Sequence, residues 1–314
     1  MSDAALPPPG RLVDIGAGRR LHMMALGEGA PTVVFESGGG GGSAVQDRPA
    51  QRLVSAFARA VIYDRAGLGF SDPPTPGRSF VQRAEDLFRL LEAERLPGPY
   101  VLVGGSFGGL TARAFAYRYP GEVAGMVLLD AAEEGKYFPT MARMRAWHEA
   151  DLKTEAERAA SGELRRAAEP VVAKSRAFTE DEKPWLLEIL SRPGHFLAAA
   201  EELTAIDATP APMKVAGGFG SLGGRPLIVI SSDQVMTGDM AVWHEGHAEA
   251  QARLATLSSN SAHITGTALG HSIALERPAL VAAAVAAVIA AAKGGPLDVA
   301  EVRRLAADRG AKPQ

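Results

Sequence analysis

The stretch from Val101 to Gly109 constrains this chain more than any other feature of its sequence. An apolar, β-prone run ends at glycines, a single serine stands among them, and a helix-forming segment from Leu110 to Tyr119 follows. Read as strand, tight turn and helix, the stretch places Ser106 at the apex of the turn, where only glycines fit at Gly104 and Gly108. The pattern G-x-S-x-G predicts a serine hydroxyl that projects above a helix N-terminus, where developing negative charge is favoured.

Strand-like runs alternate with helical patterns on both sides of this turn. We expect a hairpin from Arg11–Ile15 and Arg20–Ala25 at one edge. The other predicted strands are continuous apolar runs, at Pro31–Glu36, Ala60–Asp64, Val123–Leu129, Arg225–Ser231 and Ala262–Thr265. The predicted helices between and after them cover Arg48–Phe57, Phe80–Leu96, about Met240–Leu257 and a closing helix from Pro278. This alternation predicts an α/β fold with a mostly parallel sheet covered on both faces.

The alternation stops between residues 131 and 222. Helical stretches such as Pro139–Ala159 and Glu182–Ile206 fill this region. We therefore expect a core formed by residues 11–130 and 223–292, with residues 131–222 inserted as a helical cap over the strand ends. Residues 293–314 form a C-terminal tail, in which we expect one further helix before the chain frays.

The composition excludes several classes of function. The 314 residues carry a net charge of -3, 46% are hydrophobic and 22% are charged, which gives no reason to expect nucleic acid or a membrane surface as partner. The absence of cysteine excludes a thiol nucleophile and thiolate metal sites. No signal-peptide pattern opens the sequence, so we expect a cytoplasmic protein. We expect no cofactor and no metal, because His244, Glu245 and His247 lack the H-E-x-x-H spacing and are typical of a solvated helix face.

Two loops at predicted strand ends are rich in glycine. The run Ser37–Ser43 follows a core strand directly, so its backbone N–H groups are candidates for one half of an oxyanion hole. The turn from Asp64 to Asp72 also follows a strand, and we interpret Asp64 and Arg65 as an internal ion pair that holds this turn.

These features, in this order, resemble the α/β-hydrolase superfamily over roughly Arg11–Ala292, apart from the insertion. The matching motifs are the glycine loop, D-R-A-G-x-G-x-S at Asp64–Ser71, G-x-S-x-G, the helix end Arg118-Tyr119-Pro120, an apolar strand ending at Asp130 and a late Gly-His. The resemblance implies an eight-stranded sheet, a Ser-acid-His triad and a helical cap that shapes the substrate pocket. Ser37-Gly38 stands where relatives usually carry His-Gly, so the oxyanion loop departs from the family's lettering.

Ser106 and His271 are the predicted nucleophile and base. A serine hydroxyl needs a neighbouring base to take its proton. His271 follows a glycine in the loop after the last predicted strand, whereas the second candidate, His263, lies within a strand-like run. Gly39, or Gly38 or Gly40 if the register shifts, and Phe107 are expected to form the oxyanion hole.

The acid is left open by the sequence. Asp130 ends the strand after the serine turn, and we favour it over Asp233, which follows the seventh strand, the commoner position among relatives; Asp239 lies further along the same loop. The chosen carboxylate would orient the imidazole and stabilise its charged form.

The predicted function is that of a serine hydrolase, most simply a carboxylesterase on small or medium apolar esters or lactones. An aminopeptidase resembling proline iminopeptidase is an alternative, in which Glu133 and Glu134 would read a free amine; a solvated acidic turn explains these two residues more simply. A non-catalytic ligand-binding protein is the alternative from a different class. Seven cap side chains could line an acyl pocket, although we expect most of them in the cap's own core: Tyr137, Phe138, Met141, Met144, Trp147, Trp185 and Phe196.

Overall fold

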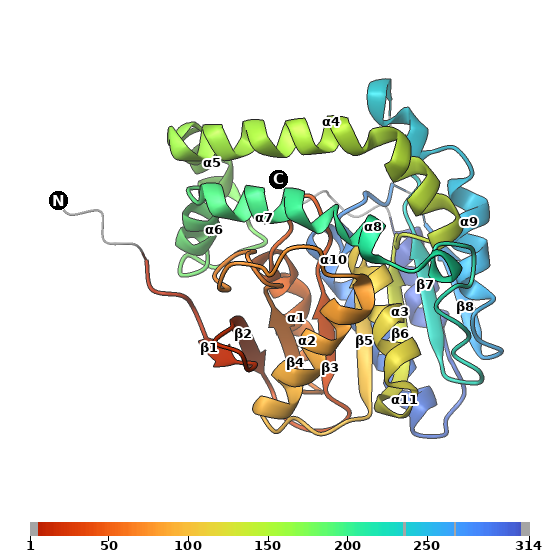
Figure 1. Ribbon diagram of the computed structural model, residues 1–314. Helices are drawn as coiled ribbons and strands as arrows, with labels where there is room; N and C mark the ends of the chain where they lie inside the picture. Colours follow the sequence, from red (N-terminus) through yellow and green to blue (C-terminus); the bar gives the residue numbers. More distant parts are fainter. Residues whose placement is uncertain (1–5, 235–236, 267, 309–314) are drawn as a thin grey trace.

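A single eight-stranded sheet organises the molecule, as seen in a computed structural model that describes residues 6–234, 237–266 and 268–308 (Figure 1). Its strands follow the order β1-β2-β4-β3-β5-β6-β7-β8, and β2 runs in the opposite direction to the other seven. The bounds are β1 Arg11–Asp14, β2 Arg20–Leu26, β3 Val33–Glu36, β4 Ala60–Tyr63, β5 Tyr100–Gly105, β6 Val123–Leu129, β7 Leu227–Ser231 and β8 Ser261–Thr265. The predicted mostly parallel, eight-stranded sheet is confirmed.

Helices cover both faces of this sheet, and the central strands are therefore buried along their whole length. One apolar core joins the sheet to α2 (Phe80–Ala93), α3 (Gly108–Arg118) and α9 (His247–Ala255). The other joins it to α1 (Arg48–Val54), α10 (Ile273–Glu276), α11 (Pro278–Ala292) and α12 (Ala300–Ala307). The helix α12 is the further helix expected in the tail.

The helix predicted over Met240–Leu257 divides into two pieces. A 3-10 helix, η4, spans Gly238–Trp243, and α9 begins only at His247. Between them Gly246 adopts φ +65°, a left-handed conformation that ends one helical segment and redirects the chain into the next.

The segment between β6 and β7 is helical and forms a layer above the carboxyl ends of the strands (Figure 1). It contains α4 (Glu134–Ala160), α5 (Glu163–Lys174), α6 (Lys183–Ile189), α7 (Pro193–Glu202) and α8 (Ala205–Ala208), followed by the 3-10 helix η3 (Ala211–Met213). The stretch predicted as one helical region over Glu182–Ile206 consists of three helices, and Pro193 begins the second of them, α7.

Buried polar contacts fasten α7 to the loops that follow β3 and β4. The ring of His195 accepts the Gly69 N–H at Nδ1 (2.9 Å), and its Nε2 lies 2.8 Å from the Gly41 carbonyl oxygen. Burial lowers the pKa of His195, which favours this neutral donor-acceptor form. The carboxylate of Glu202 accepts from Arg65 Nε at 2.6 Å and from Arg83 at 3.3 Å. The inserted helices and the strand-end loops are therefore one packed unit.

The predicted ion pair between Asp64 and Arg65 is wrong. Asp64 instead pairs with His22 Nδ1 at 2.7 Å and accepts two backbone N–H groups of neighbouring loops. Arg65 binds Glu202 and the carbonyl oxygens of Ser37 and Gly38. Successive side chains at a strand end point to opposite sides, so each residue takes its partner from a different part of the fold.

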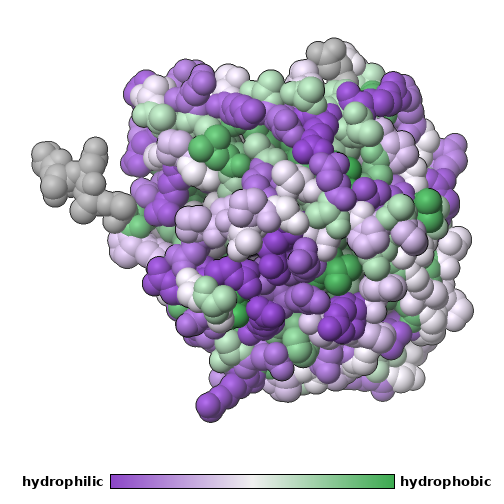
Figure 2. All heavy atoms as spheres, in the orientation of Figure 1, coloured by the Kyte–Doolittle hydropathy of each residue, from purple (hydrophilic) through white to green (hydrophobic). Residues whose placement is uncertain are grey.

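Hydrophilic residues cover much of the face drawn in Figure 2, and hydrophobic ones form small separate patches. In the ranges that the structure describes, no helix is both long and apolar enough to cross a membrane.

Candidate active site

A strained turn between β5 and α3 holds Ser106. The serine adopts φ +48°, which a residue with a Cβ rarely does, and backbone bonds to β6 fix it there: its N–H donates to the Leu129 carbonyl (3.0 Å) and its carbonyl accepts from Ala132 (2.9 Å). Glycine is required beside it. A Cβ at Gly108 would lie 2.1 Å from the Glu36 carbonyl oxygen, and one at Gly104 would lie 2.8 Å from the Gly109 Cα.

Asp130 stands at the end of the neighbouring strand, also with a positive φ of +42°. One carboxylate oxygen, Oδ2, lies 2.6 Å from His271 Nδ1. The other, Oδ1, accepts the backbone N–H of Ser232 at 2.8 Å. Burial would raise the pKa of Asp130, but hydrogen bonds from His247 and His271 together hold this pKa well below its ordinary value. The carboxylate is therefore ionised at neutral pH.

Asp233 has a different partner set. Its two oxygens accept the backbone N–H groups of Ala268 (2.8 Å) and Leu269 (2.6 Å), in the loop that leads to His271. The side chain of Asp239 lies outside the described residues. Of the two carboxylates that the sequence left open, Asp130 contacts the imidazole and Asp233 shapes the loop that carries it.

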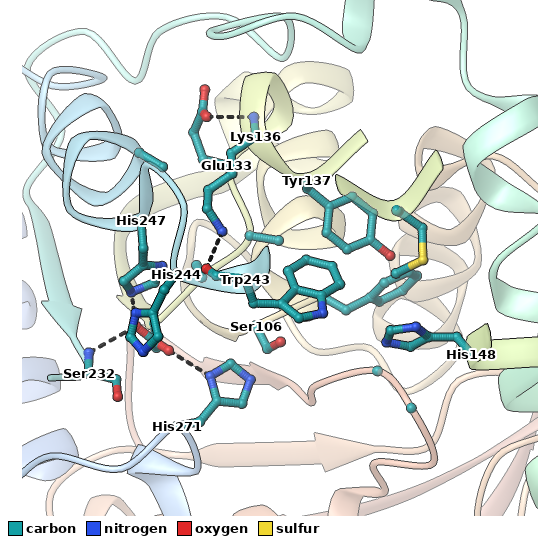
Figure 3. Close-up of a pocket in the computed structure, with 18 of the residues that line it drawn as sticks. Ser106, Glu133, Lys136, Tyr137, His148, Ser232, Trp243, His244, His247 and His271 are labelled. Atoms are coloured by element: carbon teal, nitrogen blue, oxygen red, sulfur yellow. Dashed lines mark hydrogen bonds and ion pairs between the residues drawn. The ribbon is translucent and has the colours of Figure 1, made fainter. Parts of the chain in front are cut away.

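A second histidine shares the Asp130 carboxylate. His247, the first residue of α9, places Nε2 2.8 Å from Asp130 Oδ1 (Figure 3). Its predicted place on a solvated helix face is wrong, because the side chain is only 21% exposed. The turn at Gly246 aims the start of α9 at the strand ends, and local periodicity carries no signal of this contact.

Gly39 and Phe107 lie against each other, since a Cβ at Gly39 would approach the Phe107 Cβ to 3.0 Å. Among the described residues, neither of their backbone N–H groups donates to a protein acceptor. Arg65 holds the glycine loop in place by donating hydrogen bonds to the carbonyl oxygens of Ser37 (2.7 Å) and Gly38 (2.8 Å). The N–H groups of Gly39 and Phe107 are thus two unused donors on residues that line the same pocket as Ser106.

These groups line one pocket of about 280 Å³, with Ser106 and His271 next to each other in Figure 3. Among the described residues, Ser106 Oγ and His271 form no hydrogen bond with each other. Of the seven cap residues considered, Tyr137 and Met141 line the pocket. Apolar lining also comes from Ala131, Ala132, Leu152, Ala199, Leu203, Trp243 and Ala250.

The remaining sequence candidates lie elsewhere or in other roles. His263 pairs with Ser231 Oγ at 2.6 Å on the sheet edge. Glu133 and Glu134 do not form the solvated acidic turn that we expected: both are buried, Glu133 paired with Arg253 (2.7 Å) and Glu134 with Arg113. In the part of the chain that is described, no group of three or more metal-ligating side chains is arranged to hold an ion.

The fold and the site together define a class: a strand-turn-helix serine, a histidine and a strand-end carboxylate gathered at the carboxyl edge of a mostly parallel sheet. The sequence model of the alpha/beta hydrolase fold family matches residues 31–191, about half of the chain, and the chain belongs to this family.

Individual curated relatives match only part of the chain, at identities of about one third. A 2-hydroxy-6-oxononadienedioate/2-hydroxy-6-oxononatrienedioate hydrolase of Paraburkholderia xenovorans is 34% identical over 120 residues, which are 37% of this chain and 41% of that protein. The chain spans less than half the length of the curated relatives that it matches.

Two solved structures share the fold at low identity. An esterase from Thermogutta terrifontis has a TM-score of 0.62 at 20% identity, with 90% of this chain and 98% of that chain covered. An enol-lactonase from Burkholderia xenovorans has a TM-score of 0.61 at 19% identity, with 88% and 99% covered.

Proposed function

We propose that this protein is a serine hydrolase, a carboxylesterase that cleaves small or medium esters or lactones through an acyl-enzyme. The observation that carries the proposal is the contact of 2.6 Å between His271 Nδ1 and Asp130 Oδ2, in the pocket that Ser106 also lines. The family and the hydrolases among its relatives support a hydrolase.

In the proposed mechanism, His271 Nε2 takes the proton of Ser106 as Oγ attacks the ester carbonyl. Asp130 keeps Nδ1 protonated and stabilises the imidazolium that forms. The N–H groups of Gly39 and Phe107 bind the oxyanion. The imidazolium then gives its proton to the leaving alcohol, and a water molecule, activated by the same imidazole, releases the acid and regenerates the serine.

His247 has a positioning role in this proposal. By donating Nε2–H to Oδ1, it leaves Oδ2 aligned with His271 and prevents the carboxylate from turning. The Ser232 N–H acts in the same direction on the same oxygen.

A fluorophosphonate probe and p-nitrophenyl esters from acetate to decanoate test the proposal. Wild type is expected to hydrolyse the shorter esters and to be labelled at Ser106, and Ser106→Ala is expected to lose both properties while keeping its thermal unfolding temperature. Absence of turnover and of labelling in wild type would refute the proposal and favour the ligand-binding alternative.

A proline-iminopeptidase-like activity remains a second candidate because of one observation. Glu133 lines the pocket, and its Oε1 is buried without a hydrogen-bond partner. Its Oε2, however, pairs with Arg253, which offsets the negative charge that an amine would need. Release of p-nitroaniline from proline p-nitroanilide, lost in Glu133→Gln, would favour this candidate over the esterase.

A further inference from the structure

Residues that line the pocket carry buried polar atoms that have no hydrogen-bond partner among the described residues. Seven buried side-chain nitrogen or oxygen atoms have no hydrogen-bond partner in the described part of the chain, and three of them belong to residues that line this pocket: Glu133 Oε1, Trp243 Nε1 and His244 Nε2. Each unpaired buried polar group lowers the stability of the fold by about 1–3 kcal/mol. Three such groups on residues of one pocket therefore point to a ligand that pairs with them.

Trp243 is the most informative of the three, because an indole N–H can only donate. The ring is held on several sides. Tyr137 lies 6.0 Å away between ring centroids, His148 lies 5.8 Å away edge-to-face, and the Lys136 ammonium lies 5.4 Å from the ring centroid. Lys136 Nζ also donates to the Trp243 carbonyl oxygen. The direction of the N–H is therefore fixed before any ligand arrives, which lowers the entropic cost of binding to it.

The indole lies in the same pocket as the nucleophile. Trp243 and Ser106 both line this pocket, and Figure 3 draws the indole nitrogen on the side of the ring toward His148. The Nδ1 atom of His148 already forms a hydrogen bond with the Met144 carbonyl oxygen, at 3.1 Å. A substrate bound at Ser106 thus has a buried donor within the same cavity of about 280 Å³.

Resting on the serine hydrolase proposed above, we infer that the substrate is an oxygenated ester or lactone. Besides the scissile ester it carries a second oxygen, an oxo or hydroxyl group, that accepts a hydrogen bond from Trp243 Nε1. A plain hydrocarbon chain would leave this donor buried and unpaired, so the site selects against it. Trp243 is a specificity residue in this scheme and takes no part in bond cleavage.

Isosteric ester pairs test the inference. In the acyl arm, p-nitrophenyl 4-oxopentanoate and 5-oxohexanoate are compared with the 4-methylpentanoate and 5-methylhexanoate esters, in which a methyl group replaces the carbonyl oxygen. In the leaving-group arm, 2-oxopropyl butanoate is compared with 2-methylpropyl butanoate. Each pair is measured for wild type, Trp243→Phe, which keeps an aromatic ring without the N–H, and Trp185→Phe, a tryptophan outside the pocket.

The readout is the ratio of kcat/KM between the oxo ester and its methyl isostere. We expect wild type and Trp185→Phe to favour the oxo ester by about tenfold or more in at least one arm. Trp243→Phe should reduce that ratio about tenfold relative to wild type, while its thermal unfolding temperature stays close to that of wild type.

Three results would overturn the inference. If plain esters are hydrolysed and neither arm shows a preference, or if the preference survives in Trp243→Phe, the oxygenated substrate is excluded while the serine hydrolase stands. If no ester is hydrolysed and Ser106 is not labelled by a fluorophosphonate, the proposed function fails and this inference fails with it.

Discussion

Replacing Asp130 with asparagine should nearly abolish hydrolysis, and the contacts of its carboxylate show why. Three donors face it: His271 Nδ1 on Oδ2, and His247 Nε2 and the Ser232 N–H on Oδ1. An asparagine presents one oxygen and one NH₂ group to these donors. The backbone N–H of Ser232 cannot become an acceptor, so the amide oxygen occupies the Oδ1 position and the NH₂ group faces His271.

That orientation forces His271 into the wrong tautomer. Its Nδ1 must then accept, the proton moves to Nε2, and Nε2 can no longer take the proton of Ser106. Loss of the correct tautomer in a triad lowers kcat by about 10⁴, equivalent to about 5.4 kcal/mol of transition-state stabilisation.

Asp233→Asn is the matched control. It disturbs one of two bonds to the backbone N–H groups of Ala268 and Leu269 at a partly exposed site, so kcat should stay within about tenfold of wild type. Turnover of p-nitrophenyl butanoate is the assay, with thermal unfolding as the check on folding. A loss of about 10³ or more in Asp233→Asn, with Asp130→Asn within about tenfold of wild type, would refute the reasoning and move the acid to the loop after β7.

Three further perturbations have definite expected results. His247→Phe removes a donor from Asp130 and should lower kcat about tenfold and shift the acid limb of the pH–rate profile to higher pH. His247→Gln keeps an N–H donor and should restore both the rate and the profile. Equal effects of the two variants would contradict a positioning role. Arg65→Met removes the donors that hold the glycine loop after β3 and should lower kcat about 10- to 100-fold with little change in KM. A change confined to KM would argue against a role of this loop in binding the oxyanion. Burial raises the pKa of Glu36 to about 7, so the folded state holds this proton more tightly than the unfolded state. The protein's free energy of unfolding should therefore fall as pH rises from about 4.5 to about 7, and Glu36→Gln should flatten this part of the curve of stability against pH. If the pH dependence of the unfolding free energy, measured with urea, is unchanged in Glu36→Gln, the assignment is disproved.

The sequence predicted the sheet and the serine turn because both depend on local chemistry. Apolar runs bounded by glycine fix the strands, and Gly104 and Gly108 leave one backbone path around Ser106. The prediction of His271 as the base also came from its neighbours, a glycine before it and a helix after it. Its contact with Asp130 spans 141 residues, so the sequence could not show which of the two aspartates lies beside it.

Contacts made across the fold were the ones that sequence reasoning missed. His247 reaches Asp130 across 117 residues, and its orientation depends on the turn at Gly246. Asp64 and Arg65, adjacent in the chain, were expected to pair, yet their partners lie 42 and 137 residues away. Glu133 and Glu134 were misjudged for the same reason, since the arginines that permit their burial come from α9 and α3.

The buried carboxylate of Glu202 limits how this chain can be recombined with its relatives. Two core guanidinium groups, Arg65 and Arg83, are 4% and 5% exposed and converge on this one residue of α7. A chimera that received a foreign segment in place of residues 131–222 without an acid at the equivalent position would lose the carboxylate that both guanidinium groups share. Arg65 would be left with Glu36 and the carbonyl oxygens of Ser37 and Gly38 as partners. Breaking a buried ion pair in this way costs about 3–5 kcal/mol. Grafts that retain this glutamate should fold, and those that lack it should require Arg65 and Arg83 to be replaced at the same time.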